Sequence, residues 1–194
     1  MKKMIFILLA AVFVSGCVET TFEPTATSVG VPPLSEADAN ALKLYLLSAS
    51  ELEGSSWLTD GAVEQKRFSI EPEIIFLGWK GGYEIIFKKG NPSGSDFLEV
   101  GHSISLYPPE RIADRFSIKP KALSSGTKLE ELAGQKIGDA SRAYKITDTA
   151  AGSTAYLIEF TKGNVYSSVL IAGTSQFDIN MAKSLAQKAA AKIK

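Results

Sequence analysis

The sequence predicts an α+β fold: a curved antiparallel sheet of five to seven strands, packed with an N-terminal and a C-terminal helix. Apolar or alternating segments recur at 83–87, 98–106, 141–147, 154–161 and 165–172, and most are joined by short turns. Short turns favour antiparallel pairing, because parallel strands need crossovers of a dozen or more residues. Helical spacing of apolar residues is found at the two ends and in one central segment, which is typical of α+β proteins.

The domain begins with a predicted helix. Ser35-Glu36-Ala37-Asp38 has the form of a capping box, and Leu34 before it is placed to act as a hydrophobic staple. The apolar residues that follow recur at three- and four-residue spacing and so share one helix face: Ala41, Leu42, Tyr45, Leu46 and Ala49. The glycine and serines at 54–56 end this region.

The next segments are predicted to be strands. Residues 73–78 and 83–87 flank a glycine pair that favours a turn, and a second turn at 90–95 leads to a long alternating strand. Alternate residues of a strand point to opposite faces. One face of the long strand therefore holds Leu98, Val100, His102, Ile104 and Leu106, and the other holds Glu99, Gly101, Ser103 and Ser105.

A short helix is predicted to follow the long strand. Two prolines at 108–109 suit its first turn, Ile112, Ala113 and Phe116 face inward, and Lys119-Pro120 ends it. The pattern at 121–136 is ambiguous, and we expect one helical turn within 127–132. Three strands then follow at 141–147, 154–161 and 165–172, and the last two meet at a glycine-bearing hairpin loop.

The chain closes with a helix that is predicted to start at about Asp178. Its inward stripe is Ala182, Leu185, Ala186, Ala189 and Ile193, and its solvent-facing lysines are Lys183, Lys188 and Lys192. An aspartate at position 185 is therefore expected to destabilise the domain severely, whereas an aspartate at position 188 is expected to cost little.

The first residues have the layout of a secretory signal. Two lysines precede eleven apolar or small residues at 4–14, and Ser15-Gly16 leads to Cys17, the only cysteine. This run is too short for a spanning helix, which needs about 20 residues. The tetrad Val14-Ser15-Gly16-Cys17 resembles the lipobox of prokaryotic lipoproteins, which implies cleavage before Cys17 and a diacylglyceryl group on its sulfur. The alternative is an ordinary cleaved signal with an incidental cysteine.

Three parts are therefore predicted: a signal peptide at 1–16, the lipidated cysteine with a flexible tether at 17–33, and a single domain at 34–194. The lipid would anchor the protein to the cell membrane on its extracytoplasmic side. Removal of the two signal lysines leaves a net charge of −2, and no stripe of Lys or Arg is present. This charge argues against nucleic acid as a partner. A single cysteine allows no disulfide within the chain.

Segments 46–57, 137–144 and 160–165, with the alanine-rich terminal helix, resemble uncharacterised extracytoplasmic lipoproteins and the sensor domains of some actinobacterial serine/threonine kinases. The resemblance covers most of the chain after Leu34, although those kinase domains carry disulfides. It implies a ligand- or partner-binding, sensor-like module, whose partner is a small molecule or a cell-envelope protein. One alternative is a structural accessory subunit of a membrane or cell-envelope complex, and another is a cell-envelope hydrolase.

The residues offer no catalytic or metal-binding motif. The segment Gly101-His102-Ser103-Ile104-Ser105 lacks the closing glycine of a nucleophile elbow and lies within a strand. His102 is the only histidine, and the carboxylates show no recognisable ligand spacing. We therefore expect no enzyme activity, no metal and no cofactor.

The candidate ligand or partner contacts are aromatic residues beside turns: Trp57, Trp79, Tyr83 and Tyr107. Aromatic side chains with a polar group are favoured in pockets and interfaces. The alternative for Trp57 and Trp79 is that they close the hydrophobic core at strand ends.

Overall fold

The computed structural model describes residues 35–121, 126–134, 136–149 and 152–194. Its centre is a seven-stranded antiparallel sheet with the order β1-β2-β3-β7-β6-β5-β4. The strands are β1 (Val63–Glu64), β2 (Gly81–Lys89), β3 (Leu98–Leu106), β4 (Thr127–Leu132), β5 (Ala140–Asp148), β6 (Ser153–Lys162) and β7 (Val165–Gly173). The predicted α+β class is confirmed. The expected staple Leu34, the tether and Cys17 lie outside the described residues.

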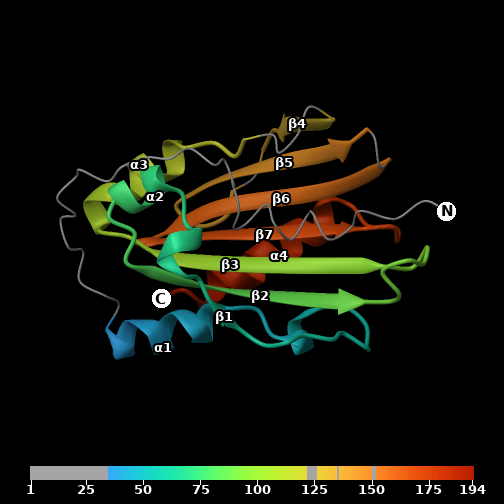
Figure 1. Cartoon of the computed structure of the whole chain (residues 1–194), viewed down its shortest axis with the longest axis horizontal. Coiled ribbons are helices and arrows are strands. Elements are labelled where there is room, and N and C mark those ends of the chain that lie inside the picture. Colours follow the sequence, from blue (N-terminus) through green and yellow to red (C-terminus); the bar gives the residue numbers. More distant parts are fainter. Residues whose placement is uncertain (1–34, 122–125, 135, 150–151) are drawn as a thin grey trace.

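Helices lie on both sides of this sheet (Figure 1). The α-helices are α1 (Glu36–Tyr45), α2 (Pro72–Phe76), α3 (Ile112–Ser117) and α4 (Ile179–Lys192), and the 3-10 helices are η2 (Ala49–Glu51), η3 (Arg67–Ser69) and η4 (Pro109–Arg111). Helices α1 and α4 pack on one face, while α2 and α3 lie at one end of the opposite face. None of the described helices combines the length and hydropathy needed to cross a membrane.

The main hydrophobic core lies between the sheet and the pair α1 and α4. Leu42 of α1 and Leu185 of α4 contact the alternate strand residues that point to this face, including Val100, Ile158 and Val169. Both helices begin as the sequence predicts. The Ser35 side chain accepts a hydrogen bond from the Asp38 backbone, and the Asp178 carboxylate accepts two from the first turn of α4.

The expected strand at 73–78 is wrong, because this segment contains helix α2. Pro72 occupies the first helical turn, where its missing N–H costs no hydrogen bond. Ile74 and Leu77 are three residues apart and both pack against a cluster around Trp79, which is a helical and not an alternating pattern. Gly78 ends the helix with a positive φ of 82°.

The helical turn expected at 127–132 is also wrong. This segment is the edge strand β4, which pairs with β5 from Thr127 opposite Asp148 to Leu132 opposite Ala143. The open edge of β5 supplies a hydrogen-bonding partner that the local sequence does not reveal. Exposed charges at Lys128 and Glu130 discourage further strands from adding to this edge.

Two lysines of α4 do not face solvent as expected. The Lys188 ammonium donates a hydrogen bond to the Glu51 carbonyl at 2.7 Å. The Lys192 ammonium donates to the Leu46 carbonyl at 2.5 Å and to the Glu51 carboxylate at 3.0 Å. Because the segment after α1 presents backbone carbonyls here, the long lysine side chains connect α4 to it.

Candidate functional site

The sheet face opposite α1 and α4 carries a row of polar residues that crosses five strands. In direct cross-strand register they are Glu84, Ser103, Ser168, Glu159 and Arg142. Neighbours in such a row lie on the same face and are close enough to interact. The Ser103 and Ser168 hydroxyls, for example, are 2.8 Å apart. We call this side of the sheet the opposite face.

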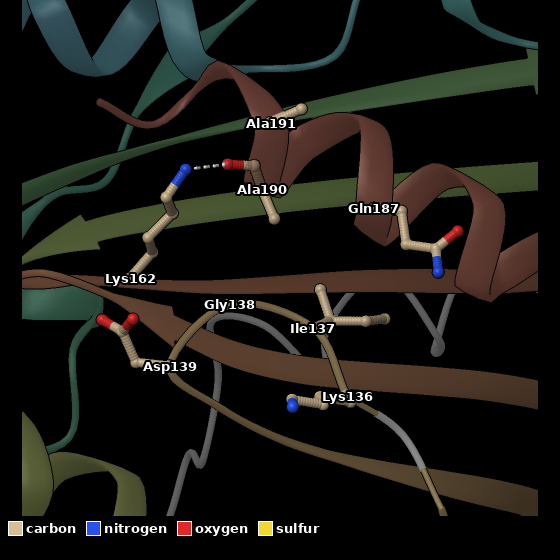
Figure 2. Close-up of a pocket in the computed structure, with 8 residues that line it drawn as sticks. All are labelled: Lys136, Ile137, Gly138, Asp139, Lys162, Gln187, Ala190 and Ala191. Carbon is tan, nitrogen blue, oxygen red and sulfur yellow. Dashed lines mark hydrogen bonds between the residues drawn. The ribbon is translucent and has the colours of Figure 1, made fainter.

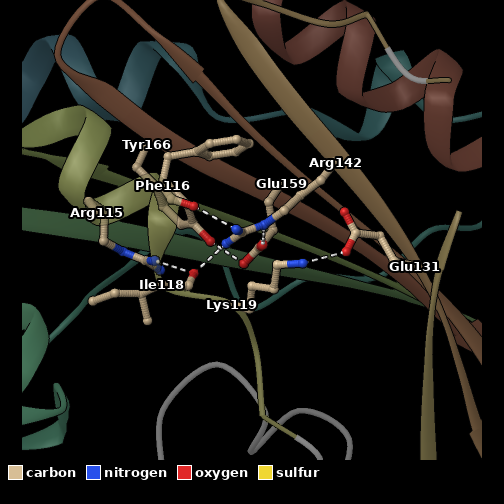
Figure 3. Close-up of polar contacts among 8 residues, drawn as sticks. All are labelled: Arg115, Phe116, Ile118, Lys119, Glu131, Arg142, Glu159 and Tyr166. Carbon is tan, nitrogen blue, oxygen red and sulfur yellow. Dashed lines mark hydrogen bonds and ion pairs between the residues drawn. The ribbon is translucent and has the colours of Figure 1, made fainter. Parts of the chain in front are cut away.

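A buried charge network holds the C-terminal end of α3 to this face (Figure 3). Arg142 Nε lies 2.6 Å from the Glu159 carboxylate, and the Arg142 guanidinium also donates to the Phe116 and Ile118 carbonyls. The Tyr166 hydroxyl donates to the second Glu159 oxygen. Arg142 and Glu159 are only 8% and 5% exposed. Each charge is thus paired and hydrogen-bonded, as buried charges require.

Arg115 of α3 adds a second, partly buried cation to this network. Its guanidinium carbon lies 3.7 Å from the centre of the Tyr166 ring, which is a cation–π contact. Burial raises the pKa of Tyr166 well above its usual value, and the Glu159 carboxylate raises it further. The Tyr166 hydroxyl therefore remains a hydrogen-bond donor at neutral pH. At the edge of the same region, the exposed Lys119 pairs with Glu131 at 2.7 Å.

Three buried polar atoms of the described residues lack a hydrogen-bond partner: Trp79 Nε1, Arg115 Nε and the Tyr144 hydroxyl. All three side chains belong to the opposite face or to the helices on it. Burial raises the pKa of Tyr144 to about 12, so its hydroxyl keeps its proton. Unsatisfied buried polar groups are few in native proteins, so their gathering on one face marks that face as unusual.

The same face is open to solvent along β1 and β2. Val63 pairs with Glu84, and Leu58 forms an isolated bridge with Lys88, so their side chains share the side on which Ile86 lies. Leu58 is 72% exposed and Val63 is 53% exposed. We call Leu58, Val63, Glu84 and Ile86 the β1–β2 surface. It gathers two of the four large exposed apolar residues found in the described structure.

Glu84 is the charged member of the β1–β2 surface. Burial alone raises the pKa of its carboxyl above the usual value, and no described side chain forms an ion pair with it. Lys88 on the same strand lies 4.0 Å from Glu99 instead. A half-buried carboxylate without an ion-pair partner loses part of its hydration, which costs free energy. A cation or N–H donor from another molecule would offset that loss.

A shallow depression of about 300 Å³ lies on the other side of the sheet (Figure 2). Lys136, Asp139, Lys162 and Gln187 supply its polar groups. Two of these groups are already used, since Lys162 donates to the Ala190 carbonyl at 2.9 Å and Asp139 accepts from the Gly163 backbone at 2.7 Å. The depression also meets the C-terminal end of α4, whose dipole disfavours the anions that lysines attract. These features do not form a convincing ligand site.

The four aromatic residues proposed from the sequence do not meet in one place. Trp79 and Tyr107 are buried together under α2 and α3 on the opposite face. Tyr83 is buried in the main core on the α1 and α4 face, where Lys43 lies over its ring. Trp57 is half-buried beside that core and donates to the Glu53 carbonyl at 3.0 Å.

His102 is enclosed on β3 and is 1% exposed. Its Nδ1 accepts a hydrogen bond from the Leu47 backbone, and its Nε2 lies 2.9 Å from the Ser167 hydroxyl. Both ring nitrogens are therefore engaged, and neither can reach a substrate from solvent. Within the described residues, no group of three or more His, Cys, Asp or Glu side chains is arranged to hold a metal ion.

Sequence reasoning missed the β1–β2 surface. Leu58 and Val63 lie in a segment with no clear periodicity, and β1 is only two residues long. The available signal was the strand at 83–87, where Glu84 and Ile86 share one face while Tyr83, Ile85 and Phe87 share the other. That alternation identifies the outward side of β2, although not the residues paired beside it.

Comparison with known proteins identifies the N-terminal segment. Residues 1–17 match the family model of the prokaryotic membrane lipoprotein lipid attachment site, and the match ends at Cys17. The protein is a lipid-anchored membrane lipoprotein. The resemblance to the lipobox is thus confirmed, and this lipid attachment site places the lipoprotein on the extracytoplasmic side. No curated protein matches the chain.

The lipoprotein domain is similar to the solved structure of the extracellular domain of PknH from Mycobacterium tuberculosis. The TM-score is 0.58 with 18% sequence identity, and the match covers 84% of this chain and 98% of that domain. At this identity the likeness shows a shared fold. It agrees with the resemblance to kinase sensor domains that the sequence indicates.

Replacement of Cys17 by serine is expected to abolish lipid attachment. Two acyl chains, at about 0.8 kcal/mol per buried methylene, anchor a protein stably, and serine offers no sulfur to carry them. The variant should appear in the soluble fraction or as an unprocessed precursor when membranes are fractionated and probed with antibody. Wild-type membrane partition together with wild-type mature size would contradict this prediction.

Proposed function

We propose that this lipoprotein is a sensor-like, partner-binding module of the cell envelope that holds another protein against its β1–β2 surface. Exposed apolar residues of monomeric proteins matter when they gather in one patch, and Leu58, Val63 and Ile86 share one side of adjacent strands. This grouping beside the unpaired Glu84 is the observation that carries the proposal.

The shape of the surface favours a protein partner over a small molecule. Small-molecule sites are concave and enclose most of their ligand, whereas the β1–β2 surface is the outer side of a sheet edge. The depression beside α4 has two of its four polar side chains, Lys162 and Asp139, already engaged in internal hydrogen bonds. A broad, exposed surface is better suited to a protein interface.

Glu84 gives the proposed partner a chemical requirement. A lysine or arginine placed against this carboxylate would supply the missing partner and return its raised pKa toward the usual value. We therefore propose that the bound surface combines apolar side chains with at least one basic residue.

The surroundings of His102 and the fold-level likeness support a binding role over catalysis. A general base must reach the proton that it removes, and His102 is enclosed with both ring nitrogens engaged. The extracellular domain of PknH has a similar fold and, as its name says, lies outside the cell. That likeness is an analogy of fold, and the residues above carry the proposal.

Site-specific photocrosslinking in living cells tests this function. A benzophenone amino acid at Leu58 should trap one protein of defined mass, because this position lies in the proposed interface. The matched control is the same amino acid at Leu44 of α1, since Leu44 is 74% exposed and Leu58 is 72% exposed. Equal trapping at the two positions would indicate random collisions and contradict the proposal.

Charge reversal at Glu84 makes the test specific. Glu84→Lys should abolish the Leu58 crosslink if a basic residue of the partner faces this carboxylate, because like charges repel. Lys80→Glu, a charge reversal of a half-buried residue just before β2, serves as the control and should leave the crosslink in place. A crosslink that survives Glu84→Lys would exclude the proposed basic contact.

A further inference from the structure

A chain of three buried hydrogen bonds connects the segment after α1 to the sheet. The Leu47 backbone N–H donates to His102 Nδ1 at 3.0 Å. His102 Nε2 lies 2.9 Å from the Ser167 hydroxyl oxygen, and that hydroxyl donates to the Ser103 carbonyl at 3.1 Å. The chain therefore runs from the end of α1 through β3 to β7, inside the main core.

The directions of these bonds require a neutral imidazole. The Ser167 hydrogen is committed to the Ser103 carbonyl, so the Ser167 oxygen accepts from Nε2–H of His102. Nδ1 then carries the lone pair that receives the Leu47 N–H. A protonated imidazole has an N–H at both positions and can accept at neither. Protonation would therefore place two donors against each other at Leu47.

The charged groups around His102 offer no compensation for protonation. The charged groups that act on His102 are Lys192 of α4 and Glu51 of η2, while Lys188 of α4 is held by the Glu51 carbonyl. Burial, with a smaller effect from Lys192, lowers the pKa of His102 to about 3, and Glu51 acts in the opposite direction. The Glu51 carboxylate is already held by Lys192 and by the Ser48 backbone and hydroxyl.

Glu51 itself does not titrate in the same pH range. Its burial acts to raise its pKa, but the hydrogen bonds from Lys192 and Ser48 prevail and lower the pKa below the usual 4.5. Glu51 thus stays ionised above pH 5. Between pH 7.5 and pH 5, His102 is the group of this cluster whose protonation is coupled to the contact.

We propose that His102 is an acid-sensitive latch, whose protonation releases the segment Leu46–Leu52 from the sheet while the strands remain paired. Only the open form can take up the proton at mildly acidic pH, because His102 is enclosed in the closed form, where both of its ring nitrogens are hydrogen-bonded. The contribution of the latch is complete above the ordinary histidine pKa of 6.5 and is lost progressively as the pH falls below it. This segment follows α1, through which the domain continues toward the lipid at Cys17.

The size of the effect follows from linkage. With a pKa of 6.5 in the open form and about 3 in the closed form, the population of the open form rises about 30-fold between pH 7.5 and pH 5. Such a minor form is detected by amide hydrogen exchange, which reports local opening even where the average structure is unchanged.

Amide exchange of the intact lipoprotein in detergent micelles tests the latch. The protection factor of the Leu47 amide, corrected for intrinsic exchange at each pH, should fall about 30-fold from pH 7.5 to pH 5. The Val169 amide in the centre of β7 should change little. An equal fall at both amides would show global destabilisation and overturn the proposal, as would constant protection at Leu47.

His102→Asn is the matched variant, because its side-chain oxygen can accept the Leu47 N–H but does not titrate. The ratio of Leu47 protection between the two pH values should fall to near 1, whatever the stability of the variant. A 30-fold change that persists in this variant would assign the effect to another group.

If the variant fails to fold, the nitrogen-15 chemical shifts of the single histidine in the wild type provide the test. They should remain those of the neutral Nε2–H form at pH 5, and titration near pH 6.5 would overturn the latch.

Discussion

Replacement of Arg142 by methionine is expected to cost about 3–5 kcal/mol of unfolding free energy, because it leaves a charge buried without its partner. Glu159 is 5% exposed and would keep only the Tyr166 hydroxyl. The Phe116 and Ile118 carbonyls would also lose this donor, so the C-terminal end of α3 would be held less firmly to the sheet. Urea unfolding of a soluble form that lacks residues 1–17 measures the loss.

The same substitution at an exposed arginine is the matched control. Arg111 pairs with Asp114 at 3.2 Å, but both side chains are about half exposed. Arg111→Met should therefore cost less than about 1 kcal/mol, as surface ion pairs do. The double variant Arg142→Met/Glu159→Met should recover part of the loss, because it removes both buried charges. Similar losses for Arg142→Met and Arg111→Met would mean that the buried network contributes no more than a surface pair.

The parts of the fold that the sequence predicts are those in which local pattern and burial agree. The alternation at 98–106 assigns each residue of β3 to its face, and His102 falls on the core side as expected. The stripe on α4 is likewise predicted, because helical spacing places Ala182, Leu185 and Ala189 on the packed side. In both elements the apolar periodicity is long and regular, so the segment's own sequence is enough to indicate its secondary structure and its buried side.

The errors arise where a distant segment decides the local structure. Ile74 and Ile75 have high strand propensity, yet α2 forms because Trp79 and Tyr107 offer an apolar surface to one side of a short helix. The segment at 127–132 becomes a strand because β5 has a free edge. Helical spacing alone predicts that Lys188 and Lys192 face solvent. In the structure they donate hydrogen bonds to Glu51 and Leu46, which are 137 and 146 positions away in the sequence.

The candidate site depends even more on long-range pairing. Glu84 can be assigned to the outward side of β2 from its alternation, but its neighbours Val63 and Leu58 are separated from it by more than a strand length of chain. Their contact follows from sheet register, which the sequence does not fix for so short a strand. The arrangement of His102 with Leu47 and Ser167 likewise joins residues that are 55 and 65 positions apart.

Substitution of Leu185 by aspartate is expected to cost at least about 4 kcal/mol, close to the total stability of about 5–15 kcal/mol of an ordinary domain. Leu185 is 2% exposed at the centre of the contact between α4 and the sheet. The change removes a buried leucine, whose loss alone costs about 2–5 kcal/mol, and adds a carboxylate that finds no cation in the apolar core. Thermal and urea unfolding of the soluble form should show a large loss or no folded state.

The control must lie on the exposed side of α4, and the structure selects Gln187 for this purpose. Gln187 is exposed, so Gln187→Asp should cost less than about 1 kcal/mol. Lys188→Asp should cost more than Gln187→Asp, because it removes the hydrogen bond to the Glu51 carbonyl and places a negative charge beside that oxygen. The expected loss of unfolding free energy is therefore largest for Leu185→Asp, smaller for Lys188→Asp and smallest for Gln187→Asp. The first difference measures the packing of α4 on the sheet, and the second measures its connection to the segment after α1. Equal losses at positions 185 and 187 would show that α4 does not pack as described.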